Sequence, residues 1–109
     1  MSLHRRGNLY WAHLDKRRPV LVLSIDARNE RAGDLIVVPC STTLREAPTH
    51  VRLVRGEGGV PQSCMLKCEQ LTTLPGKDLD TTPLGSPLAG ARIREIELAV
   101  MRAIGIPVF

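Results

Sequence analysis

Two arginines, Arg17 and Arg18, stand immediately before a proline, and the proline opens a short apolar run at residues 20–23. Pro19 fixes its own φ and pushes Arg18 toward an extended conformation, so the run is typical of a strand that begins at a defined residue. A guanidinium is a planar fork that can hold two oxygens of an anion. We therefore expect Arg18 at the mouth of a rigid strand, with its head group free to reach a bound anion. An exposed arginine in an ion pair is the alternative.

The net charge of +4 is unevenly distributed along the chain. Residues 1–31 hold seven basic and three acidic side chains, whereas the remaining chain holds eight of each. A basic N-terminal part suits a polyanion such as RNA or DNA, and a solvated basic face is the alternative. Only 3% of the residues are aromatic, so a nucleic-acid surface would depend on charge more than on base stacking.

Length and composition indicate one globular domain spanning residues 1–109. No apolar run approaches the roughly 20 residues that a membrane span needs, and the N-terminus has no signal-peptide core. The cysteines are odd in number and lack paired metal spacing, which predicts reduced thiols in the cytoplasm. The scattered histidines add no recognisable ligand pattern, so we expect no metal site and no cofactor.

Alternating and continuous apolar runs predict short strands separated by turns. We expect strands at residues 8–14, 20–25, 35–38, 50–54 and 63–67, the first two joined as a hairpin and the third ended by Pro39. Asp26 is expected to cap a short helix over residues 27–31, closed by Gly33. Residues 75–87 are expected to be irregular, with room for one more brief strand.

One long helix is predicted at the C-terminal end. Ser86 is expected as its N-cap and Pro87 as its first residue, with Gly105 ending it. Its apolar residues recur at helical spacing: Ala89, Ile93, Ile96, Val100 and Ile104. The fold class is therefore mainly β, a compact bent antiparallel sheet or small barrel, with this amphipathic helix closing one face.

Five short phrases resemble one family when they are taken together and in order. They are Arg6-Gly7-Asn8-Leu9-Tyr10-Trp11, Arg18-Pro19-Val20-Leu21-Val22-Leu23-Ser24, Asp26-Ala27-Arg28-Asn29, Val38-Pro39-Cys40-Ser41-Thr42-Thr43 and Cys68-Glu69-Gln70-Leu71-Thr72-Thr73-Leu74. The chain resembles the MazF/PemK toxin endoribonucleases of bacterial toxin–antitoxin pairs, from about residue 5 to the last helix.

The resemblance implies a small SH3-like barrel with a C-terminal helix, a fold shared with CcdB-type gyrase poisons. It also implies a homodimer with an RNA groove at the subunit interface, and an antitoxin whose acidic flexible tail occupies that groove. Members of the family cut single-stranded RNA without a metal, through attack of the 2′-hydroxyl, and leave a 2′,3′-cyclic phosphate and a 5′-hydroxyl.

The resemblance also implies roles for individual residues. Arg18 matches the catalytic arginine, and Ser41, with Thr42 beside it, matches a hydroxyl that donates to the scissile phosphate. A run of hydroxyls can instead satisfy its own backbone in a turn. The remaining candidates are RNA contacts: Lys16, Arg17, Thr43, Ser63, Lys67 and Glu69. If residues 67 and 69 were extended, both would face one side and line one groove; a surface ion pair is the alternative for them.

The chain departs from many relatives between its first two strands. Those relatives carry a long loop there with histidine or glutamate residues implicated in cleavage, whereas only Lys16, Arg17 and Arg18 separate Asp15 from Pro19. No general base can therefore be carried over. Among the histidines, His13 lies nearest the basic turn, a structural role is favoured for His50, and a disordered tail is expected at His4.

Two other functions stay open at this point. A non-catalytic toxin of the CcdB type would bind a protein target such as gyrase. A catalytically weakened member would bind RNA without cutting it, which the missing loop would explain.

Overall fold

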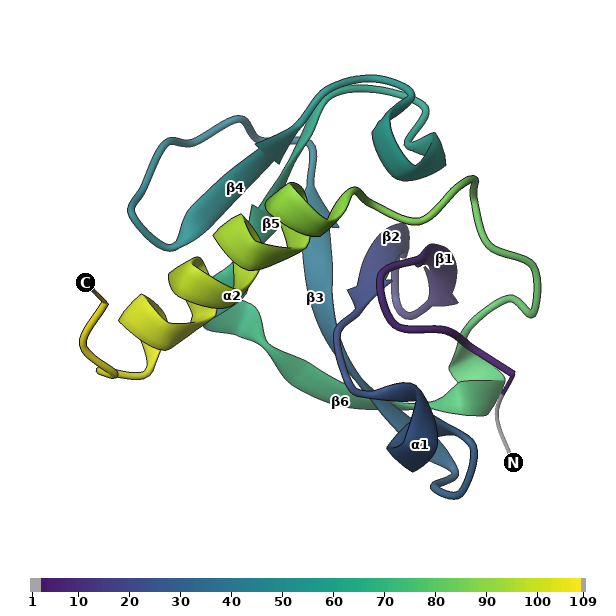
Figure 1. Cartoon of the computed structure of the whole chain (residues 1–109). Coiled ribbons are helices and arrows are strands. Elements are labelled where there is room, and N and C mark those ends of the chain that lie inside the picture. The colour runs from purple at the N-terminus through teal and green to yellow at the C-terminus, as the bar shows by residue number, and fades with distance from the viewer. Residues whose placement is uncertain (1–2, 109) are drawn as a thin grey trace.

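A computed structural model describes residues 3–108 of the chain. Within these residues, antiparallel strands are wrapped into a small barrel and one long helix packs across it (Figure 1). In chain order the elements are β1 (Leu9–His13), β2 (Arg17–Val22), α1 (Asp26–Asn29), β3 (Asp34–Ser41), β4 (His50–Leu53), η1 (Glu57–Gly59), β5 (Cys64–Lys67), η2 (Cys68–Gln70), β6 (Thr72–Pro75), η3 (Gly76–Asp78) and α2 (Gly90–Ala103).

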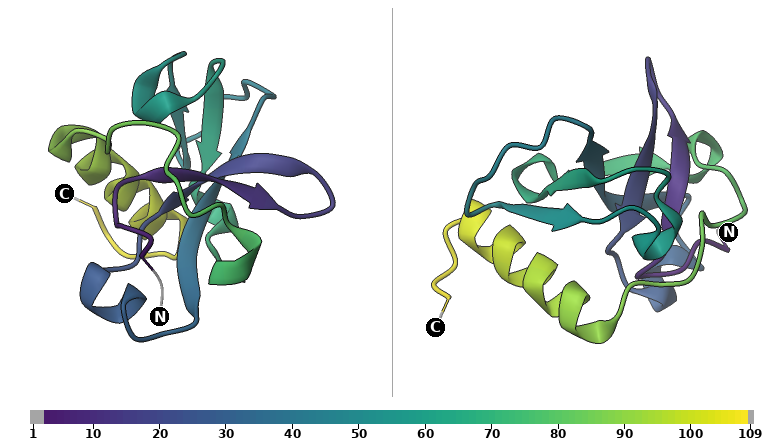
Figure 2. Two further views of the ribbon diagram at one scale, coloured as in Figure 1. Left: turned by 90° about the vertical axis from the view of Figure 1, so that its right-hand side faces the viewer. Right: turned by 90° about the horizontal axis from the view of Figure 1, so that it is seen from above.

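The expected hairpin between the first two strands is confirmed. His13 pairs with Arg17 across a three-residue turn, and the ladder continues to Leu9 and Leu21. The tip of this hairpin projects away from α2 (Figure 2). The short turn therefore lies at one end of the barrel, with the two arginines that follow it.

Strand β3 closes the barrel by changing its neighbours along its length. Its residues 34–37 pair with β6, its residues 37–39 pair with β2, and its last two residues, Cys40 and Ser41, pair with β5. The expectation that Pro39 ends this strand is wrong. Pro39 lies at the last β2 pair, immediately before the β5 ladder begins, where a missing N–H disturbs the ladder least. The strand thus continues to Ser41.

The last helix begins later than the sequence predicts. Its N-cap is Ala89 rather than Ser86, and Gly90 rather than Pro87 is its first residue. The residues before it are held along β1 instead, because the N–H groups of Leu84 and Leu88 donate to backbone carbonyls at 2.8 and 2.9 Å. Those bonds keep the segment extended and delay the helix.

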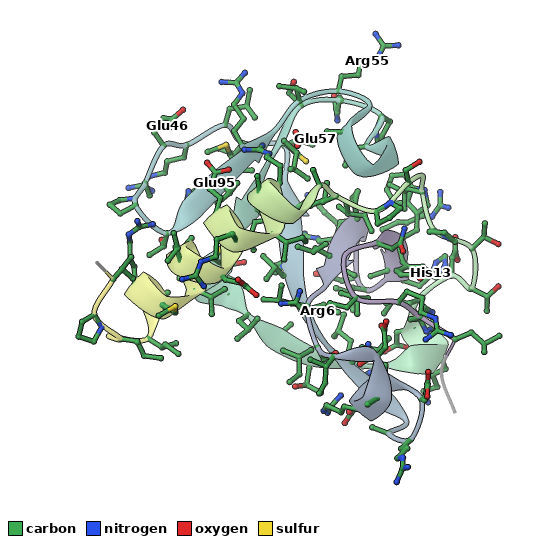
Figure 3. All side chains as sticks on the ribbon, in the orientation of Figure 1. Arg6, His13, Glu46, Arg55, Glu57 and Glu95 are labelled. Atoms are coloured by element: carbon green, nitrogen blue, oxygen red, sulfur yellow. The ribbon has the colours of Figure 1, made fainter. Side chains whose placement is uncertain are left out.

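Most of the expected helical stripe faces the barrel. Of that stripe, Ile96 and Val100 are buried and Ile93 packs against the same core, whereas Ala89 is exposed before the helix and Ile104 is 62% exposed beyond it. Two ion pairs attach the helix to the rest of the chain. Arg6 donates to Glu97 at 2.6 Å, and Arg92 donates to Glu57 of η1 at 2.6 Å; Arg6 and Glu57 are marked in Figure 3.

Two adjoining apolar clusters make the core. The larger joins the inner face of the sheet to α2, and the smaller lies under β1, β2 and β6. Their fully buried large members are Leu9, Tyr10, Val20, Leu21, Val22, Leu35, Val37, Val38, Leu53, Leu66 and Ile96. In the part of the chain that is described, no helix is long and apolar enough to cross a membrane.

Two further details differ from the sequence-based expectation. Asp26 is the first residue of α1 rather than its cap, and its carboxylate accepts the N–H of Arg6 at 2.7 Å. Strand β6 lies at Thr72–Pro75, just before the stretch where a brief extra strand was expected. The exposed Thr72 and Thr73 give no apolar pattern that would predict this strand. Leu74 packs on the smaller core cluster and lies opposite Leu35 of β3, and this apolar contact stabilises the strand.

Candidate functional site

A cavity of about 310 Å³ opens where the hairpin, the end of β3 and the start of β5 meet. Three segments line it: the hairpin from β1 to β2, the exit of β3, and the connection that enters β5. The lining residues are Trp11, Lys16, Arg17, Arg18, Pro19, Cys40, Ser41, Thr42, Thr43, Val60, Pro61, Gln62 and Cys64. The arginine and the hydroxyl cluster, more than twenty residues apart in sequence, therefore share one cavity.

Arg18 enters this cavity from the second residue of β2. Its backbone is fixed by pairing with Ala12 and by Pro19, and buried residues follow it in the strand. The side chain is half-buried, and it forms no hydrogen bond or ion pair with another described residue. Its donors are thus available to a bound anion, as the sequence predicts.

Ser41 is the last residue of β3, and its hydroxyl has a defined local partner. The Thr43 N–H donates to Ser41 Oγ at 3.2 Å, so the hydroxyl run does stabilise its own turn. This bond uses Ser41 Oγ as an acceptor and leaves its proton free to be donated. Thr42 and Thr43 are exposed beside it. A turn role and a donor role are therefore compatible at Ser41.

The neighbouring cations are held differently from Arg18. The Arg17 guanidinium carbon lies 4.4 Å from the ring centroid of Trp11, and Arg17 Nη2 lies 3.5 Å from an Asp80 carboxylate oxygen. Lys16 is exposed in the turn. The cavity is thus lined by three cations, Lys16, Arg17 and Arg18, and none of its lining residues is acidic. Such a surface attracts anions.

His13 does not line the cavity. It stands on the hairpin at one side of the molecule (Figure 3) and pairs with Asp80. The hydrogen bond from His13, helped by Arg17, lowers the pKa of the Asp80 carboxyl. His13 is therefore engaged in a surface hydrogen bond to Asp80.

The other two histidines have structural partners. The expectation of a disordered tail at His4 is wrong, because His4 is buried, packs edge-on against Tyr10 and contacts the Asp80 carbonyl at 2.8 Å. His50 bridges the loop that follows β3 to the segment after β5. Its Nδ1 lies 2.7 Å from the Arg45 carbonyl and its Nε2 lies 3.0 Å from a Glu69 carboxylate oxygen.

Both contacts of His50 favour its charged form. The Arg45 carbonyl and then the Glu69 carboxylate raise the pKa of His50 above its ordinary value. Burial raises the pKa of Glu69, but hydrogen bonds from His50 and Thr49 outweigh it, so the net shift is downward. The structural role favoured for His50 is consistent with this arrangement.

Three of the predicted RNA contacts lie outside the cavity: Ser63, Lys67 and Glu69. Lys67 is at the far end of β5, opposite His50 and roughly 10 Å along the strand from Cys64. Glu69 lies in η2, so residues 67 and 69 are not in one extended segment and the expected alternation is wrong. Lys67 and Glu69 therefore lie away from the cavity, whereas Ser63 lies in the chain between Gln62 and Cys64, which both line it.

Sequence reasoning missed several lining residues, above all Trp11, Gln62 and the cysteines Cys40 and Cys64. The signal that could have found the cysteines is strand order, because pairing the end of β3 with the start of β5 places both of them together. No three His, Cys, Asp or Glu side chains within residues 3–108 are grouped as metal ligands would be.

Comparisons with known proteins place the chain in a family. The family model described as "PemK-like, MazF-like toxin of type II toxin-antitoxin system" matches residues 5–104. A "Probable endoribonuclease MazF5" of Mycobacterium tuberculosis is 32% identical over 105 residues, covering 94% of each chain. A solved "Mycobacterium tuberculosis toxin MazF-mt6" has a TM-score of 0.83 at 27% identity, covering 93% of this chain and 99% of that one.

A second solved structure was determined with a partner. It is titled "Endoribonuclease in complex with its cognate antitoxin from Mycobacterial species", with a TM-score of 0.84 at 28% identity, covering 97% of this chain and 99% of that one. The SH3-like barrel of the CcdB/MazF type, closed by a C-terminal helix, is thereby confirmed. Since the family match spans nearly the whole chain, this chain belongs to the PemK-like and MazF-like toxins of type II toxin–antitoxin systems.

Proposed function

We propose that this chain is the toxin of a toxin–antitoxin pair and a metal-independent endoribonuclease that cuts single-stranded RNA at a specific sequence. One observation carries the proposal: the Arg18 side chain lines the same cavity as Ser41, and it has no hydrogen-bond or ion-pair partner among the described residues. A guanidinium beside a hydroxyl donor is suited to a phosphate whose negative charge increases in the transition state. The names of the curated relatives support the same activity.

The proposed reaction is a displacement at phosphorus within the RNA itself. The 2′-oxygen forms a bond to phosphorus and the bond to the 5′-oxygen breaks, which leaves a 2′,3′-cyclic phosphate and a 5′-hydroxyl. The 2′-hydroxyl loses a proton and the departing 5′-oxygen gains one. Arg18 holds two non-bridging oxygens through its fork, and Ser41 or Thr42 donates to one of them. Because the nucleophile belongs to the substrate, the reaction requires no metal-bound water.

Lys16, Arg17 and Thr43 would position the phosphates next to the one that is cut. Arg17 suits this role because Trp11 and Asp80 already hold its side chain in place. Contacts of RNA with Lys67 and Glu69 would need an RNA strand that continues along β5 beyond the cavity, whereas Ser63 lies in the chain between the lining residues Gln62 and Cys64. The one-domain chain would act in the cytoplasm, where its RNA substrate lies.

An antitoxin with an acidic flexible tail is the proposed protein partner. The three cations of the cavity would attract carboxylates of that tail as they attract phosphates. A homodimer with the RNA groove at its interface is proposed from the family resemblance. Light scattering of the purified chain tests it directly, with a mass of two 12.0 kDa protomers as the expected result and a monomer as the contrary one.

The activity itself is tested by incubating the purified chain with a long RNA in EDTA. Discrete fragments with 2′,3′-cyclic phosphate ends are expected, and a matched oligonucleotide with 2′-deoxyribose at the cut position stays intact. Intact RNA together with inhibition of gyrase would support a CcdB-like function instead. Intact RNA that is nevertheless bound would support a weakened RNA-binding member, and cleavage that EDTA abolishes would contradict metal independence.

A further inference from the structure

Two thiols share the wall of the cavity with Arg18 and Ser41. Cys40 of β3 and Cys64 of β5 are free, and they are only 4% and 3% exposed. Each thiol shifts the pKa of the other. Both line the cavity, whereas Cys68 does not. Nothing in the proposed RNA chemistry uses a thiol, so this pair needs a separate account.

The sheet register places the two cysteines diagonally on one face. Cys40 lies opposite Leu66, and Cys64 is two residues from Leu66 on the same strand. Diagonal neighbours have Cβ atoms roughly 7 Å apart, whereas a disulfide requires about 3.5–4.5 Å, so closing the pair draws the strands together by about 3 Å. Cys40 is next to the last residue of β3 and Cys64 is the first of β5. Strand ends are where a ladder can yield most easily.

The interaction between the two thiols shifts their pKa values in opposite directions. The neighbouring Cys40 thiol lowers the pKa of Cys64, although burial opposes the shift. The Cys64 thiol and then burial raise the pKa of Cys40. Burial raises the pKa of Cys68 to about 12, which leaves it inert. The lowered pKa of Cys64 favours this thiol over Cys40 for the first attack on an oxidant.

We propose that Cys40 and Cys64 form a peroxide-sensitive pair whose disulfide shuts the site. The Cys64 sulfur attacks one oxygen of hydrogen peroxide, the O–O bond breaks, and the released hydroxide takes up a proton to become water. The Cys40 sulfur then attacks the sulfenic Cys64, which forms the S–S bond while the sulfenic hydroxyl leaves with the Cys40 proton as a second water. Two thiols are oxidised by two electrons and one peroxide is reduced.

The consequence for the site follows from chain continuity. Ser41 directly follows Cys40, so drawing β3 toward β5 displaces the Ser41 hydroxyl and its bond to Thr43 relative to Arg18. A displacement of about 1 Å at a reacting centre can cost about 10²-fold in rate. The cross-link itself is independent of the proposed RNA cleavage, whereas its effect on rate rests on that function.

The test treats the full chain with hydrogen peroxide and maps the thiols by mass spectrometry, without RNA. We expect a peptide pair joined through Cys40 and Cys64 that has lost two hydrogen atoms, and its reduction by dithiothreitol. The Cys64→Ser and Cys40→Ser variants cannot form this cross-link. The Cys68→Ala variant, which changes a cysteine outside the cavity, still forms it. Because this readout uses no RNA, the cross-link supports the thiol pair even where RNA cleavage fails.

The second readout is cleavage, with each protein compared with its own untreated sample. The wild type and Cys68→Ala lose roughly 10²-fold in rate on oxidation and recover with reductant, while Cys40→Ser and Cys64→Ser keep the rate that they had before treatment. If Cys40 and Cys64 stay reduced at peroxide concentrations that oxidise ordinary cysteines, the proposed peroxide-sensitive pair is refuted. A complete cross-link with unchanged cleavage would overturn its control of the site.

Discussion

Replacing Arg18 separates function from stability more sharply than any other change in this chain. Its side chain lines the cavity and makes no hydrogen bond or ion pair with another described residue. Arg18→Ala therefore removes no folded-state interaction of that kind, and we expect the free energy of unfolding to change by less than about 0.5 kcal/mol.

The expected loss of rate is large because Arg18 supplies two donors and a full charge. Removing one preorganised donor from an active site costs about 10²–10³ in kcat, or about 3–4 kcal/mol. Arg18→Ala should thus lower kcat by at least about 10³. Arg18→Lys keeps the charge but not the fork, so it should recover only a part of this loss.

The assay measures single-turnover cleavage of a short RNA under enzyme excess, with urea unfolding of the same preparations. Arg55→Ala is the matched control: it removes the same charge from an exposed arginine that does not line the cavity, visible at the edge of Figure 3. It should cleave at the wild-type rate. Wild-type cleavage by Arg18→Ala would refute the assignment, and a loss of stability equal to the loss of activity would refute the separation.

Three further outcomes are expected. Ser41→Ala removes one donor and should lower kcat about 10²-fold with little change in RNA affinity, and a larger effect of Thr42→Ala would transfer the role to Thr42. The pKa of His50 is raised in the folded state, so its stabilisation is complete below its ordinary value of 6.5 and is lost as pH rises through the raised value. Urea unfolding across pH should show this decline, which His50→Gln abolishes. Ile96→Ala, at a fully buried helix position, should cost about 2–5 kcal/mol by urea unfolding, and a cost below about 1 kcal/mol would contradict its place in the core.

The sequence pattern predicted a strand or helix well where interactions between residues close in the chain determine it. The hairpin, the buried β2 and the inward face of α2 follow from Pro19 and from apolar spacing, and the structure confirms them. The start of α2 did not follow, because the backbone bonds from Leu84 to Leu9 of β1 and from Leu88 to Gly7 override the capping signal of Ser86. Long-range pairing therefore decides where this helix begins.

For the candidate site too, the sequence predicted some features, and long-range strand pairing determined the others. The residue types at Arg18 and Ser41 indicated phosphate chemistry, but their meeting in one cavity depends on β3 changing partners at Pro39. The same change brings Cys64 to the cavity and leaves Glu69 outside it, in a 3-10 turn beside His50. Sequence alternation could give neither placement, because both depend on which strands are neighbours.

The most direct measurement is a crystal structure of the chain with an RNA that carries 2′-deoxyribose at the cut position. Its uncut phosphate should lie in the cavity, within hydrogen-bonding distance of the Arg18 guanidinium and of Ser41 Oγ. A phosphate held elsewhere, beside Lys67 for example, with Arg18 facing only water, would contradict the proposed site.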